Sequence, residues 1–318
     1  MASDKAMSFP RSALRRAESH GGLPGGSQQT SVSGTGTSTA AAAAGCADGV
    51  ASPYDSGIDY LAYWAGRTYE HRAEVMALSR LLRGRSFSHA VDVGGGFGRI
   101  SVVLRRYADR VTIADPSTRQ LELAQRYLKG QPGVQARLMD AAHLDFDDAS
   151  IDLAVMVRLL HHLPDPADAL AETARILRPG GYAVIEAANV LHGVNRLRSL
   201  ARRGSIGETA VDIRSAQRRQ QGGIPFVNHH PERLMLQLAV CGLQVERVLS
   251  VSNLRSPVLK SVLPRRLMLA AEYALQAPLA AVYFGPSLFF LARKQDLADR
   301  TPSGRDHDSL ARCLSRPA

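Results

Sequence analysis

Residues 91–98 constrain the fold of this chain more than any other stretch, and they read Val-Asp-Val-Gly-Gly-Gly-Phe-Gly. The apolar residues at 90, 91 and 93 predict a buried strand, and residues 99–107 have the apolar spacing of a helix. The glycines between them predict a tight turn, because backbone without Cβ adopts positive φ at little cost and can approach a ligand closely. The stretch therefore predicts a strand, a ligand-binding loop and a helix N-terminus.

Strand and helix patterns alternate beyond this loop. The predicted strands cover residues 110–114, 134–139, 151–157 and 182–187, and the predicted helices cover 118–128 and 166–177. A helix at 231–241 and strands at 243–252 and 287–292 complete the set. This alternation predicts an α/β fold, a parallel sheet with helices on both faces. Ligands of such sheets bind at the carboxyl ends of the strands.

Composition divides the chain into one domain and two polar ends. Residues 1–50 are rich in Ser, Gly, Thr and Ala, which predicts a disordered tail, and residues 294–318 read as a second polar tail. The predicted domain covers residues 51–293. Within it, residues 189–228 read as a basic, mobile insertion, and the apolar residues 257–284 as a helical cover over the pocket.

The formal net charge is +10, and arginine supplies nearly all of the positive charge. Such a charge attracts nucleic acid, anionic lipid or acidic metabolites, and it selects none of them. The cysteines Cys46, Cys241 and Cys313 show no Cys-x-x-Cys spacing, so we expect no disulfide framework and no metal site. This cysteine usage and the absence of an apolar signal segment predict a cytoplasmic protein. Proline and glycine interrupt residues 267–292, so a membrane span is not expected, although contact with a membrane surface stays open.

The register of the glycine loop decides between two cofactors. A dinucleotide fingerprint, G-x-G-x-x-G, starting at Gly94 would place Arg99 where the third glycine belongs, so that match fails. The pattern acid-x-G-x-G-x-G fits completely, beginning at Asp92. An acidic side chain at the strand end suits a ligand with a cationic amino group and opposes a pyrophosphate. The predicted cofactor is S-adenosylmethionine, and the predicted loop contacts are Asp92, Gly94, Gly95, Gly96 and Gly98.

Two further strand ends carry carboxylates. Asp115 lies 21 residues after Gly94, about where an acceptor reaches the ribose hydroxyls of an adenosine, and it is also a candidate N-cap for the next helix, with Pro116 at the first helical position. Asp140 and Ala141 end the third strand. There an acceptor can take the adenine amino group and a small apolar side chain can contact the ring.

These pieces, with residues 151–163 and the run Ile176-Leu177-Arg178-Pro179-Gly180-Gly181, resemble the class I S-adenosylmethionine-dependent methyltransferases, especially the group that includes the ubiquinone and menaquinone biosynthesis methyltransferases. The resemblance covers residues 58–190. It implies a Rossmann-like doubly wound sheet of seven strands, with the last strand antiparallel. It also implies cofactor contacts from Asp92, Gly94, Gly96, Asp115 and Asp140.

Methyl transfer needs an aligned acceptor, and a base only where the acceptor is a hydroxyl or a carbon acid. His161 and His162 follow the fourth strand, so either could be that base, and the alternative is that the pair packs against or caps the turn. The candidate substrate contacts are Tyr60, Trp64, Arg158, Phe226 and His229. For Arg158 a structural ion pair is an equal alternative.

The sequence thus predicts a methyltransferase acting on a small molecule, such as a hydroxylated aromatic, quinone-like or lipid-like metabolite. One alternative is a nucleic-acid methyltransferase acting on RNA, supported by the charge. It is opposed by the absence of an Asp/Asn-Pro-Pro-aromatic run or a Pro-Cys nucleophile after the fourth strand. The other alternative is a module that binds the cofactor without catalysis. The sequence leaves the oligomeric state open.

Overall fold

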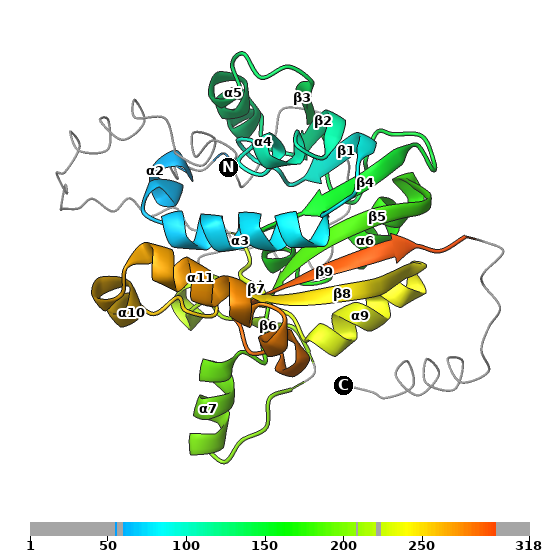
Figure 1. Ribbon diagram of the computed structural model, residues 1–318. Helices are drawn as coiled ribbons and strands as arrows, with labels where there is room; N and C mark the ends of the chain where they lie inside the picture. The colour runs from blue at the N-terminus through cyan, green and yellow to red at the C-terminus, as the bar shows by residue number, and fades with distance from the viewer. Residues whose placement is uncertain (1–54, 56–59, 208, 221–223, 297–318) are drawn as a thin grey trace, which may run out of the picture.

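A seven-stranded sheet forms the centre of the computed structural model, which describes residue 55 and residues 60–207, 209–220 and 224–296 (Figure 1). The strand order is β3-β2-β1-β4-β5-β9-β8. The strands are β1 (Phe87–Val93), β2 (Ala108–Asp115), β3 (Val134–Leu138), β4 (Ile151–Met156), β5 (Leu177–Ala188), β8 (Leu243–Val251) and β9 (Ser287–Lys294). β9 runs antiparallel to both of its neighbours, and β1 to β5 are mutually parallel. The predicted fold class, a mostly parallel Rossmann-like sheet with an antiparallel last strand, is confirmed.

Helices pack on both faces of this sheet. One face carries α3 (Thr68–Leu81), against which α11 (Arg265–Leu275) packs, and the other face carries α6 (Ala167–Ile176) and α9 (Pro231–Val240) (Figure 1). α5 (Thr118–Tyr127) packs against β2 and β3. In β9, Phe289 belongs to the core under α3 and its neighbour Phe290 to the core on the opposite face, since successive side chains of a strand point to opposite sides. A strand buried on both faces explains the unbroken apolar run that it carries.

The helix boundaries follow local chemistry. Pro231 is at the start of α9, where its missing N–H leaves no helical hydrogen bond unmade. α5 is capped by Ser117, whose hydroxyl accepts a hydrogen bond from the backbone N–H of Gln120 at 3.1 Å. Asp115 therefore is not the N-cap of this helix. The helix predicted over 99–107 is reduced to α4 (Ser101–Leu104).

The two segments that interrupt the alternation contain regular elements. Between β5 and α9 lie α7 (Gly193–Ala201), β6 (Val211–Asp212), α8 (Ala216–Gln220) and β7 (Val227–Asn228), with β6 and β7 paired antiparallel. Between β8 and β9 lie α10 (Pro257–Val262), α11 and η4 (Pro278–Val282). Within the described residues no helix is long and apolar enough to cross a membrane. The predicted tail 1–50 and most of the tail 294–318 lie outside the described residues.

Candidate functional site

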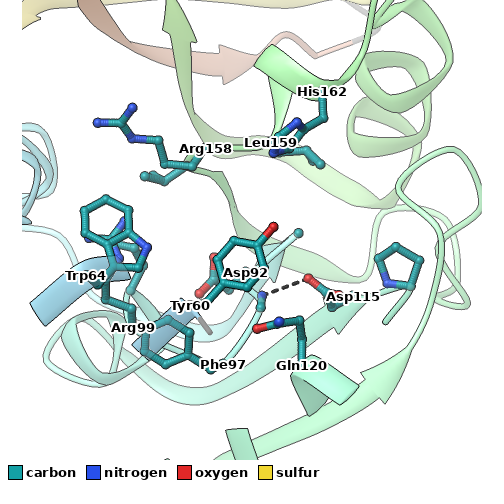
Figure 2. A pocket seen from close by; sticks show the side chains of 16 residues that line it. Tyr60, Trp64, Asp92, Phe97, Arg99, Asp115, Gln120, Arg158, Leu159 and His162 are labelled. Carbon is teal, nitrogen blue, oxygen red and sulfur yellow. Dashed lines mark hydrogen bonds between the residues drawn. The ribbon is translucent and has the colours of Figure 1, made fainter. Parts of the chain in front are cut away.

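A cavity opens at the carboxyl ends of β1, β2 and β4, the edge predicted from the winding of the sheet (Figure 2). α2 (Tyr60–Ala65) adds Tyr60 and Trp64 to its lining. The glycine loop, the end of β2, the start of α5 and the residues after β4 supply the rest, and the larger lining side chains are labelled in Figure 2. The predicted loop, the predicted ribose carboxylate and three of the five predicted substrate residues therefore share one cavity.

The glycine loop is held by its own backbone. The N–H of Gly94 donates to the Ala114 carbonyl at 2.7 Å, which ties the loop to the end of β2. Gly94 has φ +68°, and a Cβ there would lie 2.8 Å from the Leu159 side chain. Both conditions exclude other residues, because positive φ is strained for an L side chain and the neighbour is packed. The loop places bare backbone at the floor of the cavity.

Two buried carboxylates flank this backbone. Asp92 is 1% exposed and its Oδ2 accepts from the Ser101 hydroxyl at 2.5 Å. Asp115 accepts from the N–H of Gly96 at 2.8 Å, drawn as a dashed line in Figure 2, and from the N–H of Ser117 at 3.0 Å. Burial raises the pKa of Asp92 to about 6 and the pKa of Asp115 to about 6, against the effect of these hydrogen bonds. At neutral pH both are therefore anionic and face a cavity that would favour a cation.

Gln120, on the first turn of α5, is a site residue that the sequence analysis missed. Its side chain lines the cavity, and its buried Nε2 has no hydrogen-bond partner among the described residues. A buried donor without an acceptor is costly, so a ligand oxygen or ring nitrogen in the cavity would satisfy it. Its Oε1 lies 3.7 Å from the position of a Cβ on Gly96, so the side chain reaches the glycine loop. The only signal in the sequence is its place on the first turn of the helix predicted over 118–128.

The opposite wall is an ion-pair cluster around Glu74, which is fully buried on α3. The Arg99 guanidinium lies 2.8 Å from one Glu74 oxygen, and the Arg158 guanidinium lies 2.6 Å from the other. Arg99 also lies over the Trp64 ring, 3.7 Å from its centroid, and within 2.7 Å of His71 Nδ1. Burial opposes the charge of Glu74, but the two guanidiniums outweigh it and lower its pKa. Burial and Arg99 lower the pKa of His71 to about 4, so His71 is neutral at pH 7.

This cluster accounts for the mismatch at Arg99 and for one of the two alternatives at Arg158. Arg99, which breaks the dinucleotide fingerprint, pairs with Glu74 and lies over the Trp64 ring. Arg158 forms the structural ion pair that was the alternative to substrate contact, while its side chain also lines the cavity. Arg158 has φ +66°, and its N–H donates to Glu186 at 2.9 Å, which holds the backbone in this unusual conformation.

The two candidate histidines lie on η3 (Leu160–His162) with their ring centroids 3.9 Å apart, but their surroundings differ. His162 lines the cavity, whereas His161 is buried outside it with Phe226, whose ring centroid is 4.6 Å away. His162 Nδ1 is 3.0 Å from the Pro225 carbonyl oxygen, which can only accept, so Nδ1 carries the hydrogen and Nε2 is the unprotonated nitrogen. Burial lowers the pKa of His162, so the ring is neutral at pH 7.

Besides His161, five predicted site residues do not line this cavity: Gly98, Asp140, Ala141, Phe226 and His229. A Cβ on Gly98 would lie 2.8 Å from Leu128 and 2.9 Å from Ile113, so Gly98 packs against these side chains instead. His229 is buried, with Nε2 2.8 Å from the Leu160 carbonyl oxygen, so it anchors β7 to η3 instead of facing a substrate. Phe226 packs on the two histidine rings. Asp140 is exposed and accepts from the N–H of Ala142 at 2.8 Å, while Ala141 packs on the core, so their contact with adenine stays a prediction.

The predicted pocket cover at 257–284 is also absent from the lining of this cavity. α11 packs against α3 instead. Its Glu272 accepts a hydrogen bond from the Tyr69 hydroxyl at 2.8 Å. Of the apolar residues in this segment, Met268 and Ala280 are buried, whereas Val258, Val262 and Leu267 are exposed.

The sequence profile of the methyltransferase domain family matches residues 91–185, which hold the glycine loop, Asp115 and His162. The chain carries a class I S-adenosylmethionine-dependent methyltransferase domain. An O-methyltransferase of Penicillium expansum is 36% identical over 140 residues, which are 41% of this chain and 50% of the relative. A ubiquinone biosynthesis O-methyltransferase of Paracidovorax citrulli is 32% identical over 111 residues, which are 34% of this chain and 45% of the relative. The chain thus spans half or less of the length of these curated relatives.

The methyltransferase domain has the fold of known structures. A Listeria monocytogenes protein described as an S-adenosylmethionine-dependent methyltransferase superposes with a TM-score of 0.52, covering 72% of this chain and 99% of that one at 16% identity. The family match implies S-adenosylmethionine as the cofactor. The cavity of this domain fits that cofactor, because its anionic edge, its bare glycine backbone and the buried Gln120 donor suit a cationic adenosine derivative.

Proposed function

We propose that the protein transfers the methyl group of S-adenosylmethionine to a small-molecule acceptor. The observation that carries the proposal is the pair of buried carboxylates, Asp92 and Asp115, on either side of a glycine loop at the cavity floor. A phosphate-bearing dinucleotide would meet charge repulsion there, whereas a ligand with an ammonium and a sulfonium is attracted. The cofactor, when bound, supplies an activated methyl group on a cationic sulfur.

Each residue of the loop wall would contact a different part of the cofactor. Asp115 would accept hydrogen bonds from the ribose hydroxyls while it keeps the loop in place through Gly96. The anionic Asp92 would stabilise the amino group, and the backbone from Gly94 to Gly96 would lie against the methionine part. Gln120 Nε2 would donate a hydrogen bond to the adenosine, so this buried donor would no longer lack a partner.

The acceptor side is proposed to position the nucleophile and exclude water. Positioning alone lowers a barrier by roughly 7–11 kcal/mol where the reacting atoms are aligned. Tyr60 and Trp64 give this side aromatic surface, and Arg99 and Arg158 give it positive charge, which favours a hydroxylated aromatic, quinone-like or lipid-like acceptor. Two of the relatives reported above are named O-methyltransferases, which supports an oxygen acceptor.

His162 is our candidate for the base that removes the proton of such a hydroxyl. Its Nε2 is the basic nitrogen, and the hydrogen bond from Nδ1 to Pro225 fixes that tautomer. His162→Gln keeps an amide donor for Pro225 but has no base, so both His162→Gln and His162→Ala should lower kcat by roughly 10²–10⁴. Cofactor affinity, measured by calorimetry, should change little. If kcat persists in both variants, His162 is not the base.

The proposal is tested by incubating the full chain with S-adenosylmethionine labelled on its methyl group and with separate panels of phenolic, quinol, lipid and RNA acceptors. We expect label in a small-molecule acceptor. Label in RNA would replace the proposed acceptor class, and tight binding of the cofactor without turnover on any panel would favour the non-catalytic alternative.

A further inference from the structure

α7 is a helix of nine residues, Gly193–Ala201, and none of them is buried. Three large apolar side chains are largely exposed, with Val194 at 54%, Leu197 at 67% and Leu200 at 76%. Most short helices in proteins are stabilised by packing an apolar face, so a helix that exposes such a face lacks its partner. In Figure 1, α7 extends away from the sheet and its covering helices.

The apolar side chains of α7 share one side of the helix. With 3.6 residues per turn, Leu197, Leu200, Ala201 and Val194 fall within about 120° of the circumference. Arg196 lies beside one border of this arc, and Arg198 and Arg202 lie beyond the other border. Residues 189–207 contain four arginines and no acidic residue. This is an apolar stripe flanked by cationic side chains, as in helices that lie in the plane of a lipid interface.

The apolar surface continues at the N-terminal end of α7. The Gly193 N–H donates to the Phe284 carbonyl at 2.8 Å, and Phe284 is 43% exposed. A Cβ on Gly193 would lie 2.6 Å from the Phe284 ring, so the ring is directly against the start of the helix. Because α7 follows the carboxyl end of β5, this surface is on the edge of the sheet at which the cavity opens.

We propose that α7 and Phe284 form a docking surface for a membrane that contains anionic lipids. The exposed leucines would enter the boundary between headgroups and acyl chains, and Arg198, Arg202 and Arg203 would meet lipid phosphates. A second copy of the chain fits less well, because pairing α7 with itself would bring arginines of like charge together. RNA fits less well too, since the apolar stripe would then face phosphates.

The proposal goes beyond methyl transfer and does not depend on it. If the acceptor is apolar, docking would bring the cavity close to it, because the cavity edge of the sheet would lie near the lipid phase. Its test needs neither cofactor nor acceptor, so a failure of the proposed function would leave the result unaffected.

The test is flotation of the full chain with phosphatidylcholine vesicles, with and without phosphatidylglycerol. We expect binding to the anionic vesicles, weakened by added salt. The double variant L197Q/L200Q should lower the partition coefficient at least about tenfold, and R198Q/R202Q should lower it by a similar factor on anionic vesicles. Both pairs are on the surface, so the fold should be retained. Val240→Gln is the matched control, because Val240 is 57% exposed on α9 and should leave binding unchanged.

Three results would overturn the proposal. The first is no binding of the unaltered chain to anionic vesicles. The second is equal binding by L197Q/L200Q and the unaltered chain, which would assign the binding to another segment. The third is a dimer in sedimentation velocity that L197Q/L200Q dissociates, which would assign the surface to a second copy of the chain.

Discussion

The two walls of the cavity are built in different ways. The loop wall comes from the glycine loop, Asp115 and Gln120, which line the cavity with backbone atoms, two carboxylates and an amide. The opposite wall combines α2, α3 and the residues after β4, held by the buried Glu74 between Arg99 and Arg158. A wall made by one contiguous stretch can be recognised from its sequence, whereas a wall made by tertiary contacts requires the structure.

Glu74→Gln should have the largest effect of the variants considered, and it acts on the opposite wall. The change removes the buried carboxylate that pairs with the buried Arg99 and with the partly exposed Arg158, so the free energy of unfolding should fall by about 3–5 kcal/mol. Glu246→Gln is the control, because Glu246 forms a partly exposed ion pair with Arg85 at 3.5 Å and should cost less than about 1 kcal/mol. Urea unfolding measures both. Equal losses in the two variants would show that the Glu74 cluster does not hold the second wall.

Asp115→Ala should act on the loop wall. Losing hydrogen bonds to a charged group should weaken S-adenosylmethionine binding by about 1.5–3 kcal/mol in calorimetric titrations. Asp152→Ala is a matched control, since Asp152 also accepts from two backbone N–H groups, those of Ser88 and His89 at 2.9 and 2.8 Å, but at the opposite end of β1. It should lower stability without changing cofactor affinity. Unchanged affinity in Asp115→Ala would remove Asp115 from the site.

Gly98 tests how tightly the loop wall is packed. Gly98 has φ +84° and an added Cβ would lie 2.8 Å from Leu128, while Gly130 has φ +83° and no atom within 4 Å of an added Cβ. Alanine at either position carries the same backbone strain, so the difference between them isolates packing. We expect Gly98→Ala to cost about 1–3 kcal/mol more than Gly130→Ala in urea unfolding. Equal costs would contradict a tightly packed loop.

The smallest effect concerns pH. The pKa values of Asp92 and Asp115 are raised to about 6 from the ordinary 3.8, so their contribution to folding is greatest at low pH and is lost as the pH rises toward 6. A cationic ligand binds the ionised carboxylates more tightly, so its affinity should increase as the pH rises. Between pH 5 and 7 we expect S-adenosylmethionine affinity to rise by about tenfold per coupled carboxylate, with proton release on binding below pH 6. Calorimetry in buffers of different ionisation enthalpy measures both, and a flat profile would contradict the assignment.

The parts that the sequence predicted share a physical property, which is that they depend on neighbours along the chain. The glycine loop, Asp115 and the antiparallel last strand follow from local pattern and from the family resemblance. Arg99 was only a mismatch, because its partner Glu74 lies 25 residues earlier on a different helix. The choice of His162 over His161 depends on how η3 turns.

The arginine-rich insertion shows the same limit. Its composition predicted a mobile segment, but an amphipathic helix, α7, lies within it. Periodicity over nine residues is a weak signal when arginines interrupt it, and the exposed face could be recognised only once the fold had excluded it from the core.

The central claim is that the loop wall holds a cationic adenosine cofactor. Calorimetric titration of the full chain with S-adenosylmethionine and, separately, with NAD tests it most directly. We expect binding of S-adenosylmethionine at a single site, weakened by about 1.5–3 kcal/mol in Asp115→Ala, and no measurable heat with NAD. Tight binding of NAD without binding of S-adenosylmethionine would contradict the account.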